Sequence, residues 1–409
     1  MTTTARLADR HLDVTIVGAG QAGLAAAHEL VVRGLVPGES MVVVDGNDGP
    51  GGAWRHRWDS LTFDKAHGIA DLPGMPLGRP DPAVPSRLVV ADYYGRYEEK
   101  FGLEVVRPVQ VVAVREAGHL DRPGALLVEA TGPQGPFSFT TTLLISATGT
   151  WTNPFVPYVP GIETFTGRQL RTVDYRRPED FADRRVLVVG GGLSAVQFLL
   201  PIATFAATTT WATRRPPNFT ASPFVKNDWG VAVERAVRER TGAGLPPASV
   251  VRTTGIPLWR EYLDGVDAGV LVSRGMVRSF GPTTARFEPE PAFTHGAEGL
   301  GPSASGALVV PPSWQPFDAV TDVDVDTVLW ATGFRAALKH LSPLRLREPG
   351  GGILMRDEVR LAKDDRILLV GYGSSASTTG ATRAGRRAGR AAWAQLGVRA
   401  APRALVRQV

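Results

Sequence analysis

Two runs of β-branched and aliphatic residues in this chain each lead directly into a glycine-rich turn. Val14–Val17 precedes the turn Gly18-Ala19-Gly20-Gln21-Ala22-Gly23, and Val186–Val189 precedes Gly190-Gly191-Gly192-Leu193-Ser194-Ala195. A short continuous apolar run is typical of a buried parallel strand. Residues 21–33 have helical spacing, and the apolar runs 41–44 and 208–213 supply a following strand for each turn. The pattern therefore predicts two βαβ units with parallel strands.

The rest of the pattern is more mixed. It predicts helices over residues 88–101 and 379–396, strands over 323–330 and 367–370, and a small antiparallel sheet from 103–114, 125–130 and 143–146. Pro154, Pro157 and Pro160 mark a connector, because proline cannot sit inside a regular element. Residues 216–320 are rich in Gly, Pro and Ser towards their end and predict long loops. The two βαβ openings are the only internal repeat that the sequence shows.

These elements predict an α/β protein with two dinucleotide-binding, Rossmann-like domains. We expect the second domain, residues 166–321, to be inserted into a discontinuous first domain formed by residues 1–165 and 322–409. The inserted domain would carry loops that shape a substrate site. A length of 409 residues is sufficient for two such domains with separate cores.

Composition narrows the possible functions. The chain has no cysteine, which excludes disulfides, thiolate metal sites and the redox-active cysteine pair of disulfide reductases. The net charge of +5, spread over 409 residues, produces only a weak electrostatic field. The sequence contains no recognised nucleic-acid-binding motif. No stretch approaches the length of a membrane span, and residues 1–12 lack a signal-peptide core, so we expect a cytoplasmic protein without membrane or nucleic-acid partners. The arginines at 383, 386, 387 and 390 favour a solvated helix face over an anion-binding surface.

The first glycine turn has the context that dinucleotide binding requires. Gly18 permits a tight turn, Gly20 lets the backbone approach a pyrophosphate, and Gly23 lets the helix pack against the strand. The pyrophosphate would then lie at the helix N-terminus, where unpaired N–H groups favour anions. Asp45 ends the next strand and is placed to accept hydrogen bonds from an adenosine ribose. The segment Gly51-Gly52-Ala53-Trp54 supplies two glycines that a ligand can approach and a flat indole wall for an isoalloxazine. A surface turn with a core tryptophan is the less favoured alternative for this segment taken alone.

The second glycine turn differs in two ways. Ala195 stands where the third glycine would be, which the motif tolerates, and no acidic residue ends the next strand. Arg214 and Arg215 stand there instead, and guanidinium groups bind a 2′-phosphate that a carboxylate would repel. NADPH is therefore favoured over NADH, with solvent-facing arginines as the alternative interpretation.

Together these motifs resemble the class B flavin monooxygenases, namely the flavin-containing monooxygenases, the plant YUCCA-type enzymes and, more distantly, the Baeyer–Villiger monooxygenases. Further shared features are Ala147-Thr148-Gly149 with the proline-rich connector, the stretch 58–77, and the run from Asp326 to Phe334 that contains Thr332 and Gly333. The resemblance covers nearly the whole chain but is weak over residues 216–320. The residues predicted to bind the cofactors FAD and NADPH are Gly18, Gly20, Gln21, Ala22, Gly23, Asp45, Gly52, Ala53, Trp54, Ala147, Thr148, Gly149, Gly190, Gly192, Leu193, Ser194, Ala195, Arg214, Arg215, Thr332 and Gly333.

The chain departs from the family at several positions. The signature F-x-G-x-x-x-H-x-x-x-(Y/F/W) has Arg171 at its His position, which in the family couples the two nucleotide sites. Asp64 and His67 stand where many flavin-containing monooxygenases carry Asn and Lys, and Leu193-Ser194 replaces a common Asn-Ser pair. Asp64, His67 and Arg171 are the candidate catalytic residues, each with a purely structural or surface role as the alternative. Asp59-Ser60 replaces the aromatic-Pro pair of Baeyer–Villiger enzymes.

The resemblance implies a monooxygenase that uses NADPH and O₂ on a small organic substrate at N, S or electron-rich C. In the family, reduced FAD reacts with O₂ to a C4a-(hydro)peroxyflavin that bound NADP⁺ protects, in a site that excludes water. A Baeyer–Villiger enzyme, a peroxide-releasing NADPH oxidase and a non-catalytic flavoprotein redox sensor are the alternatives. No metal is expected, because the histidines show no ligand spacing.

Overall fold

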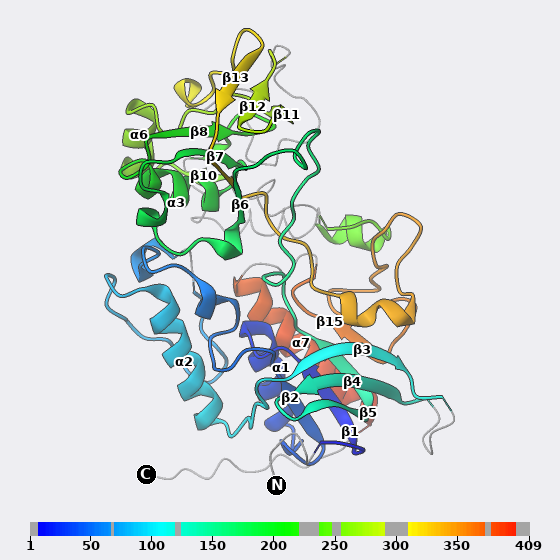
Figure 1. The fold of residues 1–409 in the computed structure, drawn as a ribbon. Helices are drawn as coiled ribbons and strands as arrows, with labels where there is room; N and C mark the ends of the chain where they lie inside the picture. The colour runs from blue at the N-terminus through cyan, green and yellow to red at the C-terminus, as the bar shows by residue number, and fades with distance from the viewer. Residues whose placement is uncertain are drawn as a thin grey trace. The chain divides into compact units, whose positions relative to one another are not determined.

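The computed structural model describes residues 7–66, 69–118, 124–220, 237–247, 255–290, 310–372 and 378–397. The chain divides into two compact units (Figure 1). The first unit comprises Met1–Trp151, Glu234–Pro247 and Ala336–Val409, and the second comprises Thr152–Val233 and Ala248–Arg335. The predicted class, an α/β protein with one Rossmann-like unit inserted into the chain of another, is confirmed.

The first unit is built on a six-stranded sheet with the order β2-β1-β5-β4-β3, and β15 pairs with β5 outside this path. Its elements are β1 (His11–Val17), α1 (Gln21–Val31), β2 (Met41–Val44), η1 (Gly52–His56), η2 (Phe63–Lys65), α2 (Ser86–Lys100), β3 (Gln110–Glu116), β4 (Leu126–Gly132), β5 (Gly135–Ser146), η6 (Lys339–Leu344), β15 (Ile367–Leu369) and α7 (Thr378–Leu396). Strand β1 lies between β2 and β5 and is parallel to both, so the carboxyl ends of the three strands lie at the same edge. That edge carries the first glycine turn.

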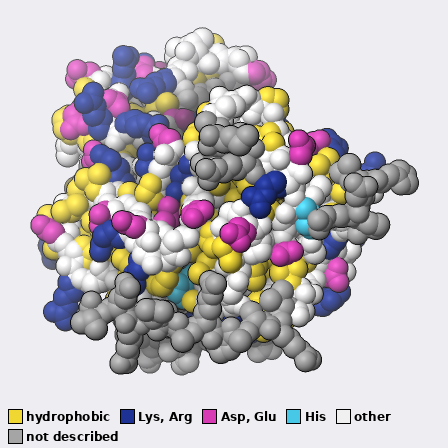
Figure 2. Space-filling view, turned by 90° about the horizontal axis from the view of Figure 1, so that it is seen from below, with side chains coloured by type: hydrophobic (Ala, Val, Ile, Leu, Met, Phe, Trp, Pro, Cys, Tyr) yellow, Lys and Arg dark blue, Asp and Glu magenta, His cyan; other side chains and the backbone are white. Residues whose placement is uncertain are grey.

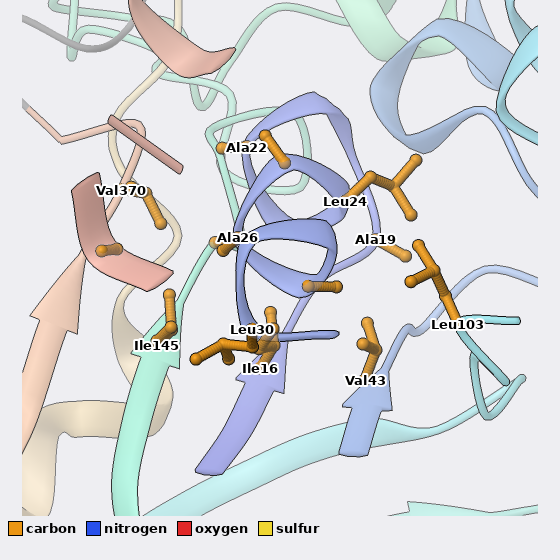
Figure 3. Packing of buried hydrophobic residues seen from close by; sticks show 14 of the residues in the cluster. Ile16, Ala19, Ala22, Leu24, Ala26, Leu30, Val43, Leu103, Ile145 and Val370 are labelled. Carbon is orange, nitrogen blue, oxygen red and sulfur yellow. The ribbon is translucent and has the colours of Figure 1, made fainter. Parts of the chain in front are cut away.

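Helix α1 packs on this sheet through its small and aliphatic side chains. Ala26 and Leu30 lie against Ile16 of β1 and Ile145 of β5, all fully buried (Figure 3). Helix α7 then packs closely on α1, because it carries glycines where the two backbones meet. A Cβ added to Gly385 would lie 2.2 Å from the carbonyl oxygen of Ala22. The C-terminal helix therefore belongs to the same layer as the first βαβ unit.

The arginines of α7 lie on an exposed face of the helix, as the sequence predicted. They pair with two buried carboxylates of the first unit. Glu358 accepts from Arg383 and Arg387, and Glu29 of α1 accepts from Arg386 and from Arg390 at 2.6 Å. The two carboxylates are 2% and 5% exposed, whereas the arginines are about half exposed. The cluster therefore joins α7 to the rest of the unit.

The second unit is built on a four-stranded parallel sheet with the order β6-β14-β7-β8. Its elements are β6 (Arg168–Arg171), η3 (Thr172–Asp174), η4 (Pro178–Phe181), β7 (Arg185–Val189), α3 (Leu193–Ile202), β8 (Thr208–Ala212), β9 (Phe219–Thr220), β10 (Ile256–Pro257), α6 (Arg260–Asp267), β11 (Val277–Phe280), β12 (Thr284–Phe287), η5 (Pro311–Ser313), β13 (Thr321–Asp324) and β14 (Thr327–Trp330). A separate antiparallel sheet has the order β11-β12-β13. Strand β7 and helix α3 flank the second glycine turn.

Three predicted elements differ from the structure. Strand β3 begins at Gln110 rather than Leu103, because Pro108 has no N–H for a strand ladder. Strands β3 and β4 do not form a separate antiparallel sheet, since β4 continues through β5 into the parallel sheet. The predicted strand 323–330 is two strands in different sheets, β13 and β14. The chain turns between them at Asp326, whose carboxylate accepts from the N–H and guanidinium of Arg185.

The domain boundaries also differ from those expected at residues 165 and 322. Residues 152–165 and 322–335 cluster with the second unit. The reason is that β14 lies between β6 and β7 and pairs with both, so it completes the second sheet. The short segment Glu234–Pro247 joins the first unit instead, where the N–H of Met355 donates to the carbonyl oxygen of Thr241 at 3.1 Å.

Candidate functional site

The first glycine turn is tightly packed on one side and open on the other. Gly18 has a positive φ of 102°, and a Cβ there would lie 2.5 Å from the carbonyl oxygen of Ala147. A Cβ at Gly23 would lie 1.9 Å from the carbonyl oxygen of Gly18. A Cβ at Gly20 would meet no described atom within 4 Å. Gly18 and Gly23 are therefore required by the turn itself, whereas Gly20 faces space that a contact between backbone and phosphate would use.

Asp45, at the end of β2, is held in place by the turn. One carboxylate oxygen accepts from the N–H of Ala19 at 2.6 Å, and the other accepts from the N–H of Asn47 at 2.8 Å. The guanidinium of Arg107 lies 3.8 Å away. Each carboxylate oxygen has a second acceptor position. Asp45 is thus oriented at the strand end where the ribose hydroxyls of a dinucleotide bind.

The segment Gly51–Trp54 lies against the first turn. Gly51 and Gly52 both have positive φ, and a Cβ on Gly52 would lie 2.8 Å from the Cα of Gly20. Trp54 follows in η1, partly buried against the core, and Ala53 is exposed. Two sequence segments that were predicted separately to contact the same cofactor are therefore adjacent.

Gln21 and Ala22 act differently from the other predicted residues of this turn. The side-chain amide of Gln21 donates to the carbonyl oxygen of Ala70 and to the hydroxyl of Thr382, each at 2.9 Å. The carbonyl oxygen of Ala22 faces Gly385 of α7. These residues serve the packing of α1 on α7, so any contact with a cofactor would be through backbone N–H groups of the first helical turn.

Ala147-Thr148-Gly149 follows β5 beside Gly18. The hydroxyl of Thr148 donates to the carbonyl oxygen of Ala337 at 2.9 Å, and Ser146 Oγ lies 3.2 Å from Nε2 of His340. Burial lowers the pKa of His340 to about 4, so this imidazole is neutral at physiological pH. Sequence reasoning missed His340, because its side-chain partner Ser146 lies 194 residues away along the chain.

A partly buried arginine of the first unit was also missed. The guanidinium of Arg57 lies over the indole rings of Trp54, Trp58 and Trp151, with its Cζ 5.7, 5.6 and 4.4 Å from the ring centroids. Its Nε is buried without a hydrogen-bond partner, and burial lowers its pKa to about 10. Cation–π contacts contribute about 0.5–2 kcal/mol each, whereas taking a cation out of water costs several kcal/mol without a counter-charge. The sequence signal for this cluster was the segment Trp-Arg-His-Arg-Trp over residues 54–58.

The second glycine turn repeats the geometry of the first. Gly190 has a φ of 141°, and a Cβ there would lie 2.2 Å from the carbonyl oxygen of Ala331. Ala331-Thr332-Gly333 follows β14 just as Ala147-Thr148-Gly149 follows β5, because β14 is parallel to β7 and β5 is parallel to β1. The internal repeat therefore extends beyond the two βαβ openings. Thr332 and Gly333 lie in the second unit, where the hydroxyl of Thr332 donates to the carbonyl oxygen of Phe155.

Residues after the second turn begin α3, with Leu193 and Ser194 in its first turn and Ala195 fully buried; Gly192 is its N-cap. Arg214 and Arg215 follow β8, and Arg214 is exposed. Arg274 lies beside this strand end, since its N–H donates to the carbonyl oxygen of Trp211 at 2.9 Å. The sequence did not point to Arg274, which is distant along the chain. Its guanidinium donates to Gln315 and lies over the ring of Phe317, so only Arg214 and Arg215 follow directly from the strand end.

The three candidate catalytic residues have different surroundings. Asp64 is in η2, and its carboxylate accepts from the hydroxyl of Thr62 at the surface. Arg171 forms a two-point ion pair with Asp174, at 2.8 and 3.0 Å, which raises the pKa of Arg171. His67 lies outside the described residues. Among the described residues no cluster of His, Asp and Glu could hold a metal ion, and no helix of the described chain could cross a membrane.

The face that Figure 2 displays carries charges of both signs. Lys and Arg side chains alternate with Asp and Glu on the face that Figure 2 displays. This mixture agrees with the weak net charge of +5.

Two Rossmann-like units, each with a glycine turn and an adjoining Ala-Thr-Gly segment, define a flavoprotein oxidoreductase that takes a flavin and a nicotinamide cofactor. Residues 15–241 match the family described as pyridine nucleotide-disulphide oxidoreductase. A flavin-containing monooxygenase from Stenotrophomonas maltophilia is 31% identical, with a TM-score of 0.71, and the alignment covers 95% of this chain and 99% of that one. The chain belongs to this family and, within it, to the class B flavin monooxygenases.

Curated relatives include the probable indole-3-pyruvate monooxygenase YUCCA4 of Arabidopsis thaliana and the indole-3-pyruvate monooxygenase YUCCA1 of Oryza sativa subsp. japonica. They are 33% and 34% identical over 193 and 200 residues, which cover 47% and 49% of this chain. The matches span 44% and 47% of the two relatives, about half of their length. The bacillithiol disulfide reductase of Bacillus cereus shares the fold at 17% identity and a TM-score of 0.60. Because this chain has no cysteine, it lacks the thiol pair that its family's name describes.

Proposed function

We propose that this protein is an FAD- and NADPH-dependent monooxygenase that inserts one oxygen atom of O₂ into a small organic molecule. The observation that carries the proposal is the repeated geometry of the two turns. Gly18 and Gly190 each lie against the carbonyl of an Ala-Thr-Gly segment, in separate units. Two nucleotide sites in a chain without cysteine support electron transfer from a nicotinamide to a flavin, with oxygen as the next acceptor.

FAD is assigned to the first unit. Gly20 leaves room for a pyrophosphate at the start of α1, and Asp45 is oriented for the ribose. Gly52, Ala53 and Trp54 lie against the same turn, which suits the ribityl chain and the ring. When bound, the flavin would supply hydride acceptance and the activation of O₂ at C4a. The residues of this unit bind and orient the cofactor, and their burial keeps water from its ring.

NADPH is assigned to the second unit. The turn Gly190–Gly192 and the N-terminus of α3 would hold its pyrophosphate, and Arg214 and Arg215 would hold its 2′-phosphate. No carboxylate ends β8 to repel that phosphate. Arg274 is not assigned to this phosphate, because its guanidinium donates to Gln315 and lies over the ring of Phe317. The guanidinium groups of Arg214 and Arg215 favour the phosphorylated nucleotide over NADH.

The substrate is proposed only as a class: a small molecule oxygenated at N, S or electron-rich C. Two of the relatives are named for indole-3-pyruvate, which is a small organic acid. Baeyer–Villiger oxidation is the second candidate, but Asp59-Ser60 in place of the aromatic-Pro pair disfavours it. A peroxide-releasing oxidase differs from both because its O₂ uptake needs no organic substrate. A redox sensor differs because it does not consume NADPH steadily.

The test begins with anaerobic reduction of the FAD-loaded protein by NADPH, followed by rapid mixing with O₂. We expect flavin bleaching on reduction and then the absorption spectrum of the C4a adduct. Substrate-dependent O₂ uptake identifies the monooxygenase, substrate-independent stoichiometric peroxide identifies the oxidase, and no sustained NADPH consumption identifies the sensor. Protein that binds no flavin after reconstitution contradicts the whole assignment.

A further inference from the structure

Arg57 is a partly buried cation that is surrounded by aromatic rings. It follows η1 in the first unit, and its guanidinium lies over three indole rings, those of Trp54, Trp58 and Trp151. Indole faces attract a cation and shield it from water, but they do not neutralise its charge. We call Arg57 and these three tryptophans the arginine–tryptophan cluster.

No anionic partner for Arg57 is found in the described part of the chain. No carboxylate oxygen there forms an ion pair with its guanidinium, and its Nε is buried without a hydrogen-bond partner. Other buried charges in the unit are paired, for example Glu29 with Arg390 and Glu98 with Arg107. Burial alone lowers the pKa of Arg57, with no opposing charge to raise it. A guanidinium that is partly withdrawn from water, with no carboxylate paired to it in the described chain, is suited to bind an anion that a ligand brings.

The arginine–tryptophan cluster lies among the segments to which we assign FAD. Trp54 closes the Gly51–Trp54 segment, and Trp151 stands two residues after Gly149. His56 connects the cluster to Asp45: its ring is nearly parallel to that of Trp151, with centroids 6.3 Å apart. Its Nε2 lies 2.6 Å from Oδ1 of Asn47, and the N–H of Asn47 donates to the Asp45 carboxylate. Three segments that we assign to the cofactor therefore meet at one partly buried cation.

We propose that Arg57 is the counter-cation of the bound flavin cofactor, with the three indoles excluding water from the pair. FAD carries negative charge in two places that a guanidinium can bind: the diphosphate, and the N1–C2=O2 edge of the ring when the flavin is reduced. Both present oxygen or nitrogen acceptors to a planar fork of donors. The inference rests on the proposed FAD site and adds to it a residue that specifies how tightly, and in which redox state, the cofactor is held.

The test uses Arg57→Met and Arg57→Gln, which remove the charge, and Arg57→Lys, which keeps it. Arg87→Met is the matched control, since Arg87 is exposed and pairs with Asp59. Deflavinated full-length protein is titrated with FAD and with ADP, and the midpoint potential of the reloaded protein is measured against a reference dye. Circular dichroism and thermal unfolding verify that each variant is folded.

Pairing with the diphosphate predicts a 10- to 100-fold loss of affinity for FAD and for ADP in the charge-removing variants. Pairing with the reduced ring predicts unchanged affinity for oxidised FAD and a lower midpoint potential. In both cases Arg57→Lys recovers most of the effect and Arg87→Met behaves as the wild type. Folded Met or Gln variants with wild-type affinity and potential would overturn the inference, even if KM for an anionic substrate rises. Wild-type protein that binds no FAD contradicts the proposed function instead, so the two failures are distinct.

Discussion

The carbonyl oxygen of Gly18 lies so close to Gly23 that a Cβ added there would be 1.9 Å from it, whereas a Cβ at Gly20 would meet nothing within 4 Å. Gly20 and Gly23 lie in the same turn but are glycine for different physical reasons. Gly23 is required by the packing of strand against helix. Gly20, whose φ of −80° any residue can adopt, is required only if a ligand lies against it.

This difference predicts opposite results for two alanine variants. Gly23→Ala should lower the free energy of unfolding of the apoprotein by about 1–3 kcal/mol, because backbone must move to accommodate the methyl group. Gly20→Ala should change it by less than about 0.5 kcal/mol and should lower FAD affinity by roughly 10-fold or more. Urea unfolding and FAD titration measure the two effects. Equal FAD affinity of Gly20→Ala and the wild type would argue against a pyrophosphate at this turn.

Arg214 and Arg215 should determine the preference for NADPH. Replacing both with Gln should raise the Kd for NADPH by about 10- to 100-fold, since hydrogen bonds to charged groups contribute about 1.5–3 kcal/mol. The Kd for NADH, which has no 2′-phosphate, should change little. Arg260→Gln, in the same unit and with its side chain 87% exposed, is the control. Parallel loss of both nucleotides, or of neither, would remove the two arginines from the 2′-phosphate site.

Asp64 remains a candidate for controlling the proton of the oxygenating flavin. If it lies over the flavin in the loaded enzyme, Asp64→Ala should leave NADPH oxidation in place but divert it from product to hydrogen peroxide. The measurement is the ratio of product formed to NADPH consumed. In the structure this carboxylate lies at the surface and accepts from the hydroxyl of Thr62, so a ratio equal to that of the wild type is also an informative result. An unchanged ratio would leave Asp64 with a surface role.

Glu29 should contribute stability that depends on pH. Burial raises the pKa of Glu29, but the hydrogen bond from Arg390 and the charge of Arg33 together outweigh this effect. The net pKa is therefore below its ordinary value. The contribution is present above the unfolded pKa near 4.5 and is lost as pH falls through the lower folded pKa. Glu29→Gln should cost about 1–3 kcal/mol at pH 7, less than a fully buried pair because its arginines are half exposed.

The control for Glu29 is Glu39→Gln, because Glu39 is exposed. Urea unfolding at pH 7, 5 and 3.5 should show the gap between Glu29→Gln and the wild type narrowing with acid, while Glu39→Gln stays close to the wild type throughout. A gap that is independent of pH would contradict the ionic role of Glu29.

His340 should make the protein sensitive to mild acid. Its pKa is about 4 in the folded chain and 6.5 ordinarily, because burial disfavours the cation. Between these values the unfolded chain binds a proton that the folded chain excludes, so stability falls as pH falls from 6.5 to 4. The loss could reach about 3 kcal/mol, and His340→Gln should lack it. Unfolding curves across this range measure the slope, and identical slopes in both proteins would show that His340 is protonated when folded.

Local sequence patterns were sufficient for the two βαβ units. The apolar runs ending at Val17 and Val189, with glycines placed directly after them, predicted strand, turn and helix because the physical requirements of that turn lie within a few residues. The Ala-Thr-Gly segments and Asp45 were found in the same way. The predicted strand over 323–330 depended on distant partners and was wrong, since it divides between two sheets. The arginines of α7 lie on the exposed face that the sequence predicted, but their pairing with buried carboxylates depends on residues far along the chain.

The sequence by itself thus determined the fold class, the family and the two glycine turns, because each is encoded by neighbouring residues whose backbone must take one path. Only the tertiary structure decided which unit receives β14, what Gln21 and Arg171 bind, that His340 is buried and that Arg57 lies over three indole rings. Those properties arise from contacts between residues far apart in the chain. Burial and pairing set the charge of a side chain, and neither can be read from its neighbours in sequence.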